Sequence, residues 1–181
     1  MHGRTPPLGG GSRAAGRPSR GSGLDGAAQP PRAGAGAAMI SVLLVTHGRL
    51  AEEMLSAARV IAGELPNFRA LSLEWTEGID EARARIAREV ADLDQGDGVL
   101  ILTDMFGDTP SNAALALRES GRVEVVTGVN LPMVVRLGCT RAARQSLEET
   151  ARWLEIKGRR SIARAGSVPH GPPPGGDLGG G

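Results

Sequence analysis

The sequence predicts an α/β domain with an open, mainly parallel, doubly wound sheet of strand order 2-1-3-4 and helices on both faces. Short apolar segments rich in β-branched residues alternate with longer segments in which apolar residues recur at helical spacing. Residues 99–103 are apolar on both faces, as expected of a parallel strand that helices cover on both sides. Because strands and helices alternate, right-handed crossovers would bring the strands into one sheet.

The domain occupies the middle of the chain. Residues 1–38 and 166–181 hold 17 of the 27 glycines and nine of the 12 prolines, so we expect both terminal segments to be disordered. The first segment has five arginines and one aspartate but no apolar core region, so we expect either that Met39 is the functional start or that the segment is a dispensable leader. Residues 39–165 are then one domain, long enough to bury a core.

Composition restricts the functional classes. A formal net charge of +1 favours neither a nucleic-acid binder nor a protein selective for acidic substrates. Cys139 is the single cysteine, which excludes a disulfide within the chain, and no run reaches the roughly 20 apolar residues of a membrane span. His2 and His170 lie in the terminal segments, so we expect no metal site, no cofactor and a cytoplasmic protein.

The first half of the domain predicts two strands and two helices. Residues 40–45 are too short and too β-branched for an independent helix, so they predict a buried strand that leads directly to His47. From Leu50 the apolar residues recur at helical spacing until a glycine and a proline break the pattern. Residues 68–73 predict a second strand, and Thr76 is the expected N-cap of a long amphipathic helix.

The third and fourth strands follow. Residues 99–103 predict the third strand, and Asp104 comes directly after it. Thr109 precedes a proline, which predicts an N-cap and a short helix through Leu117. Residues 123–127, rich in β-branched valine and threonine, predict the fourth strand.

The C-terminal part predicts two more helices and a last strand. A short helix is expected at residues 131–137. Ser146 and Glu149 have the spacing of a capping box, which predicts a helix that ends at about Lys157, before a glycine. Residues 160–165 predict one further short strand.

Two polar residues are expected to meet at one edge of this sheet. His47 ends the first strand and Asp104 ends the third, and in the order 2-1-3-4 these strands are neighbours at the point where the strand order reverses. Thr109 and the loop at Gly128 lie on the same edge. A lone histidine after a strand is usually a loop residue, and an aspartate at a strand end usually caps a turn. Their expected proximity is what favours a chemical role.

This pair suits phosphoryl transfer. A carboxylate that accepts a hydrogen bond from one imidazole nitrogen fixes the tautomer and leaves the other nitrogen free to attack. The N-terminus of the following helix, N–H groups around Gly48 and Gly107, and the Thr109 hydroxyl would stabilise phosphate oxygens without a metal. Because Asp104 would also repel a bound phosphate, the resulting phosphohistidine should be reactive.

Three motifs occur in order along the chain. They are Val45-Thr-His-Gly48 with Leu50-Ala-Glu52, Leu102-Thr-Asp-Met-Phe-Gly-Asp-Thr-Pro-Ser-Asn112, and Val126-Thr-Gly-Val-Asn-Leu-Pro-Met133. Over residues 39–165 the chain resembles the IIA component of mannose-type phosphotransferase systems.

The resemblance implies a phosphotransferase subunit that acts through a phosphohistidine. His47 would accept a phosphoryl group, at Nε2, from the phosphocarrier protein HPr and pass it to a IIB component, with Asp104 as its hydrogen-bonding partner. The resemblance assigns the phosphate cradle to the matching positions Gly48, Phe106, Gly107 and Thr109.

Three further expectations come from the resemblance. Members are homodimers that exchange a C-terminal strand, which here would be residues 160–165. The chain is most similar to the stand-alone alphaproteobacterial form, which serves a regulatory phosphorelay. One departure is that Gly107 is followed by Asp108 where the family usually has a second glycine; if that position needs a positive φ, Asp108 is strained, and its charge would repel a phosphate.

Two alternative functions share features with this pattern. A histidine phosphatase also attacks through a histidine followed by a glycine, but it has arginine where this chain has Thr46 and needs a second active-site histidine. A regulatory binding module is the other alternative, because phosphorylation of His47 adds about −1.5 to −2 charges at neutral pH and would switch a docking surface without onward transfer. In the carrier interpretation, we expect the onward acceptor to be a separate protein.

Overall fold

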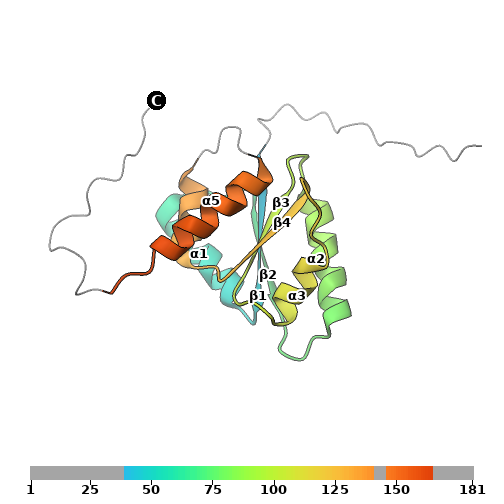
Figure 1. The fold of residues 1–181 in the computed structure, drawn as a ribbon. Coiled ribbons are helices and arrows are strands. Elements are labelled where there is room, and N and C mark those ends of the chain that lie inside the picture. The colour runs from blue at the N-terminus through green and yellow to red at the C-terminus, as the bar shows by residue number, and fades with distance from the viewer. Residues whose placement is uncertain (1–38, 141–145, 165–181) are drawn as a thin grey trace, which may run out of the picture. The chain divides into compact units, whose positions relative to one another are not determined.

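The structure is a computed structural model that describes residues 39–140 and 146–164. Four strands form one fully parallel sheet of order β2-β1-β3-β4, which confirms the predicted fold class (Figure 1). The elements, in chain order, are β1 (Ser41–His47), α1 (Leu50–Ala62), β2 (Phe68–Leu73), α2 (Ile79–Leu93), β3 (Val99–Thr103), α3 (Thr109–Leu115), β4 (Val123–Thr127), α4 (Leu131–Cys139) and α5 (Leu147–Arg160).

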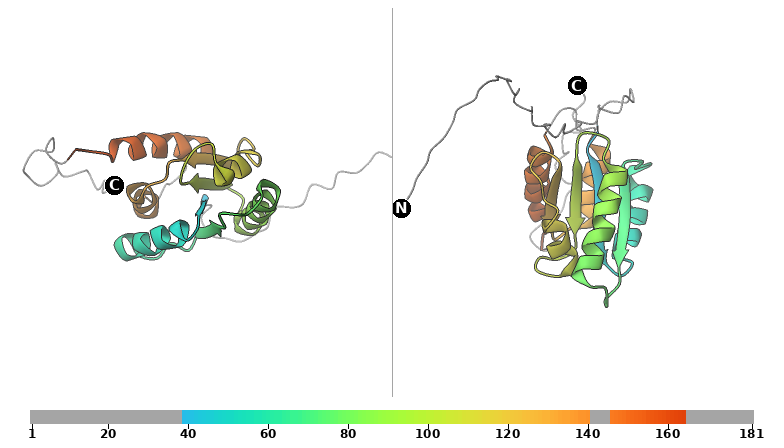
Figure 2. Two further views of the ribbon diagram at one scale, coloured as in Figure 1. Left: turned by 90° about the horizontal axis from the view of Figure 1, so that it is seen from below. Right: turned by 90° about the vertical axis from the view of Figure 1, so that its right-hand side faces the viewer.

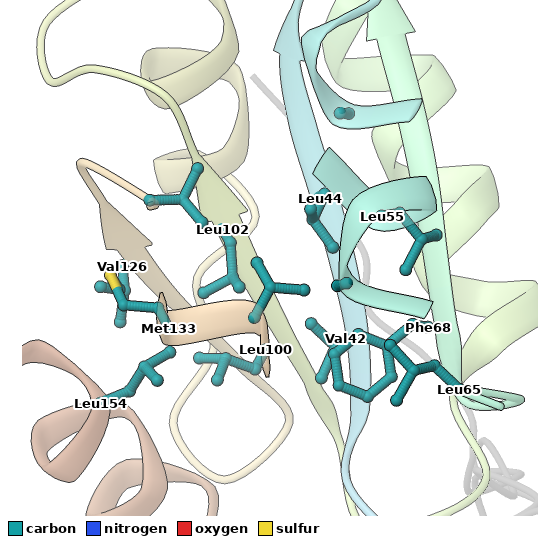
Figure 3. Packing of buried hydrophobic residues seen from close by; sticks show 14 of the residues in the cluster. Val42, Leu44, Leu55, Leu65, Phe68, Leu100, Leu102, Val126, Met133 and Leu154 are labelled. Carbon is teal, nitrogen blue, oxygen red and sulfur yellow. The ribbon is translucent and has the colours of Figure 1, made fainter. Parts of the chain in front are cut away.

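The helices form a layer on each face of the sheet, with α1, α4 and α5 on one face and α2 and α3 on the other (Figure 2). Because side chains alternate along a strand, β1 contributes Val42 and Leu44 to the first face and Leu43 and Val45 to the second. All four are buried. Figure 3 shows the first of these two apolar cores, in which side chains of β1 and β3 pack under the helices. The site residues therefore extend from a sheet that is covered on both faces.

Two predicted helix starts are wrong. Helix α2 begins at Ile79 after Gly78, because residues before it form a turn in which the Glu77 N–H donates to the Glu74 carbonyl at 3.0 Å. Thr76 is therefore not an N-cap. Helix α3 has Asp108 as its N-cap and Thr109 as its first residue, because the Asp108 carboxylate accepts the free N–H of the third helical residue.

The capping box at the start of α5 is confirmed, but the predicted end of this helix is wrong. Ser146 accepts from the Glu149 N–H at 3.2 Å, and the Ser146 N–H donates to the Glu149 carboxylate at 2.9 Å, which lowers the pKa of Glu149. The helix continues through Gly158, where a Cβ would lie 2.5 Å from the Met133 Sδ. Gly158 thus lets α5 approach α4 closely and does not terminate it.

Two predictions concern the chain ends. Arg160 is the last residue of α5 and residues 161–164 form no strand within this chain, so the predicted strand at 160–165 is absent from a single copy, apart from Ala165, which lies outside the described residues. The disorder predicted for residues 1–38 and 166–181 also falls outside them. Within the ranges that the structure describes, no helix is both long and apolar enough to cross a membrane.

Candidate functional site

His47 and Asp104 meet at the carboxyl ends of β1 and β3. The pairing between β1 and β3 ends at Val45 and Thr103, so His47 and Asp104 both lie just beyond the end of this pairing. The His47 Nδ1 is 2.9 Å from the Asp104 Oδ2, and the His47 backbone N–H donates to the same oxygen at 3.1 Å. The two side chains are only 16% and 15% exposed. The structure therefore brings together the two residues that the sequence placed at the point where the strand order reverses.

These contacts select one tautomer of the neutral imidazole. An ionised carboxylate only accepts hydrogen bonds, so the Nδ1 that faces Asp104 carries a proton and donates it. The other carboxylate oxygen of Asp104 accepts the Met105 N–H at 3.1 Å, so both oxygens of this side chain are held. The neutral His47 ring then has its lone pair on Nε2, away from Asp104.

Asp108 is a second carboxylate beside the same ring nitrogen. Its Oδ2 lies 3.5 Å from the His47 Nδ1, and the side chain is 14% exposed. Its backbone φ is −104°, in the extended region, whereas the positive φ of this loop, 91°, belongs to Gly107. The strain expected at Asp108 from the sequence is therefore absent, because the one special conformation falls on the glycine.

Asp108 also builds the start of α3. Its Oδ1 accepts the Ser111 N–H at 3.1 Å, and the Ser111 hydroxyl accepts the Asp108 N–H at 3.2 Å. This reciprocal pair is a capping box with serine in the place of the usual glutamate. The Oδ1 of Asp108 therefore caps helix α3, and its Oδ2 lies beside His47.

We expect Asp108→Ala to lower the free energy of unfolding by about 1 kcal/mol, because the N-cap bond is lost. Asp108→Asn is the matched control, since asparagine caps equally well and removes the same charge. The measurement is urea unfolding followed by circular dichroism. A strained Asp108 would instead make Asp108→Gly more stable than the wild type, and that result would contradict the capping role.

Trp75 is a site residue that sequence reasoning missed. Its indole stacks on the His47 imidazole with 4.7 Å between ring centroids and 15° between ring planes. The side chain is 77% exposed and lies in the loop after β2. The sequence does contain one indication of this contact. Strand β2 neighbours β1 in the sheet, and Trp75 follows the last residue of β2 by two positions.

Thr46 joins β1 to α1. Its buried hydroxyl accepts a hydrogen bond from the Ala51 N–H, in the first turn of α1, at 2.7 Å. The N-cap residue of this helix, Arg49, makes no such bond with its own side chain. The first turn of α1 is thereby tied to the strand that carries His47. Thr46 thus fixes the position of the helix N-terminus relative to the imidazole.

The phosphate cradle expected from the sequence is only partly open. The Gly48 N–H donates to the Leu73 carbonyl at 2.8 Å, and the Gly107 N–H donates to the Ser111 Oγ at 2.8 Å. The Phe106 N–H and the Thr109 hydroxyl have no hydrogen-bond partner among the described residues. In this conformation Gly48 and Gly107 therefore shape the loops, and Phe106 and Thr109 keep free donors.

The ligand atoms of His47, Asp104 and Asp108 lie within 4.8 Å of one another. Such a group has the composition of a cation site, but the pairing of both carboxylates with one imidazole accounts for its geometry. An acidic cluster of this kind needs no ion to be explained.

Exposed apolar side chains occur close to His47 and Asp104 in the chain and over the His47 ring. Leu50, Met105 and Phe106 are exposed in the segments that directly follow the two site residues, and Trp75 is exposed over the ring. We call these four residues the apolar rim. An exposed apolar group of this kind around a polar centre is typical of a site that receives another protein.

The family model described as "EIIA-man: PTS system fructose IIA component" matches residues 41–154. The mannose-specific EIIAB component of the phosphotransferase system (PTS) of Escherichia coli K12 is 31% identical over 124 residues, which are 68% of this chain. The match spans only 38% of that relative's length. The fructose-specific EIIA component of Bacillus subtilis is 33% identical over 100 residues, which are 55% of this chain and 68% of the relative.

Solved structures agree with these matches. A PTS IIA protein associated with the fucose utilization operon of Streptococcus pneumoniae aligns with a TM-score of 0.61 at 30% identity, and covers 71% of this chain and 95% of its own. The resemblance to an alphaproteobacterial regulatory form stays a prediction.

Proposed function

Because the chain belongs to the EIIA-man family of PTS IIA components, we propose that it is a phosphoryl carrier whose acceptor atom is the Nε2 of His47. One observation supports Nε2, and not Nδ1, as the acceptor atom. The His47 Nδ1 is held by Asp104 at 2.9 Å, so Nε2 is the ring nitrogen with a free lone pair.

The transfer step needs little chemistry from the protein. The Nε2 lone pair forms a bond to phosphorus while the bond from phosphorus to its donor atom on HPr breaks, and that donor atom keeps the electrons of the broken bond. Catalysis then consists of in-line positioning and of stabilising charge on the equatorial oxygens. The Phe106 N–H and the Thr109 hydroxyl are the donors that this chain offers for those oxygens.

Asp104 acts on the product as well as on the acceptor. A ring with a phosphoryl group at Nε2 and a proton at Nδ1 is formally cationic, and the Asp104 carboxylate neutralises that charge through the bond at Nδ1. Asp108, 3.5 Å from the same nitrogen, adds a second negative charge on this side of the ring. Both carboxylates lie by Nδ1, so the ring separates them from a phosphoryl group on Nε2.

The apolar rim supports a protein as the phosphoryl donor. We propose that HPr contacts the rim and that a IIB component is the onward acceptor. The name of the Escherichia coli relative joins an A and a B component, which is consistent with transfer from one to the other in that protein.

The second copy of this chain is the other proposed partner. Strand β4 pairs with β3 on one side and, among the described residues, has no partner strand on the other. A groove of about 320 Å³ follows that free edge between β4, α4 and α5, and its lining includes Val125, Val126 and Met133. We propose that two copies exchange the segment after Arg160 into this groove.

We expect sedimentation equilibrium to give twice the chain mass, and Ile162→Asp to shift the equilibrium toward the monomer, because a charge replaces an apolar side chain that is 81% exposed in a single copy. Val60→Asp, the same kind of change at an α1 side chain that is 86% exposed and does not line the groove, is the control. A wild-type protein that sediments as a monomer at tens of micromolar would contradict the dimer.

The proposed function is tested by intact-mass analysis of the full chain after incubation with phosphoenolpyruvate, Enzyme I and HPr. We expect one acid-labile phosphate per chain. Subsequent addition of IIB distinguishes a carrier, which loses the phosphate, from a binding module switched by phosphorylation, which retains it. A folded wild-type chain that takes no phosphate from its cognate HPr would overturn both.

A further inference from the structure

We propose that Trp75 is a positioning residue for phosphoryl transfer, which holds the plane of the His47 imidazole by stacking on one of its faces. This inference rests on the proposed function, because it assigns Trp75 a role in presenting the Nε2 of His47.

Asp104 alone does not fix the plane of the ring. Its carboxylate contacts the imidazole at one edge, through Nδ1, and rotation about the last side-chain torsion of a histidine is soft. A second contact on the face of the ring restricts that rotation. The indole of Trp75 provides it, 4.7 Å away and within 15° of parallel.

The sheet register explains how Trp75 reaches His47. Leu73, the last residue of β2, is paired with His47, and the Leu73 carbonyl accepts the Gly48 N–H at 2.8 Å. Trp75 is two residues farther along, so its indole lies over the ring of the neighbouring strand. A Cβ added to Gly48 would lie 3.6 Å from the Trp75 Nε1, so the indole also packs over the backbone that follows His47.

Hydrogen bonds hold the backbone of the loop that carries Trp75, although the Trp75 side chain is exposed. The Glu77 carboxylate is 4% exposed; it accepts the Glu74 N–H at 3.2 Å and pairs with the Arg85 Nη1 at 2.5 Å. The other terminal nitrogen of Arg85 donates to the Ser72 carbonyl at 3.1 Å. Helix α2 therefore holds both ends of the turn, which fixes where the backbone of Trp75 lies relative to β1.

A flat aromatic face has two consequences for the reaction. It attracts the cationic ring that exists once Nε2 is phosphorylated and Nδ1 is protonated. It also covers one face of the imidazole and leaves the Nε2 edge open to a donor. Both effects act on transfer itself, whereas an exposed tryptophan that served only as a docking contact would act on the binding of HPr.

The first test needs no phosphate. In proton NMR spectra, the ring protons of His47 should be shifted upfield by the indole ring current. The shift should persist in Trp75→Phe and disappear in Trp75→Ala, while Trp153→Phe, at the only other tryptophan, should leave it unchanged. His47 signals that do not respond to Trp75→Ala would overturn the stacking, whatever the protein does with phosphate.

The second test is rapid-quench transfer from phosphorylated HPr at increasing HPr concentrations. For Trp75→Ala we expect the transfer rate constant at saturating HPr to fall by about three- to tenfold, with Trp75→Phe restoring most of it and Trp153→Phe matching the wild type. A saturating rate constant that is unchanged, with only the concentration dependence altered, would mean a docking role and would overturn the proposal.

These outcomes separate this proposal from the proposed function. A wild-type chain that takes no phosphate overturns the proposed function and this proposal with it. A wild-type chain that is phosphorylated, beside a Trp75→Ala variant that is phosphorylated equally fast at saturation, overturns the role of Trp75 alone.

Discussion

His47→Ala is expected to abolish phosphorylation of the chain by phosphoenolpyruvate, Enzyme I and HPr. The reason is that His47 is the one histidine among the described residues, so none of those residues offers another imidazole in place of its Nε2. The two carboxylates beside it, Asp104 and Asp108, are held by the hydrogen bonds described above and repel a phosphate. The measurement is the fraction of chains that carry a phosphate after a labelling time at which the wild type is complete.

His170→Ala is the control for the same substitution elsewhere in the chain, and it should be labelled like the wild type. His47 packs against Trp75, so circular dichroism of His47→Ala must first show a folded protein. Labelling of a folded His47→Ala variant to an extent similar to the wild type would place the acceptor at another residue and contradict the assignment.

The His47 and Asp104 pair could be predicted from the sequence because two simple regularities determine it. Apolar periodicity locates β1 and β3, and the carboxyl ends of neighbouring parallel strands lie at one edge of the sheet. The structure adds only the distance, 2.9 Å, and the ring nitrogen that makes the contact.

The contacts that sequence reasoning missed are those between loops. Nothing in the local pattern around Trp75 indicates that its indole turns toward β1, because that direction depends on the turn held by Glu77 and Arg85. The choice of Asp108 as the N-cap of α3 escapes sequence reasoning for a related reason. Thr109 and Asp108 are both good N-caps, and which one caps the helix depends on where the positive φ of the loop falls, here on Gly107.

The C-terminal prediction went wrong through packing. A glycine after a helical run commonly ends it, but Gly158 lies where α5 passes Met133 of α4, and the close approach of the two helices requires a residue without a side chain. The chain therefore stays helical to Arg160.

Asp104→Asn is expected to slow phosphorylation of His47 by about 10²- to 10⁴-fold at saturating HPr. The His47 ring is no longer held in the reactive tautomer, and the negative charge of Asp104 is lost as well. An asparagine amide can donate as well as accept, so it no longer requires the proton of His47 to be on Nδ1. In the tautomer with the proton on Nε2, that nitrogen has no lone pair for phosphorus. The neutral amide also leaves the cationic phosphorylated ring without its nearest counter-charge.

Asp108→Asn separates the two causes, because it removes one negative charge beside the same Nδ1 and leaves the bond to Asp104 in place. We expect it to slow transfer by less than about tenfold, as expected for a charge effect without a change of tautomer. Rapid-quench measurements on both variants make the comparison, after urea unfolding has shown that both are folded. If the Asp104→Asn variant were phosphorylated no more slowly than the Asp108→Asn variant, the rate of transfer would not depend on the tautomer of His47. Asp104 would then act only through its negative charge, as Asp108 does.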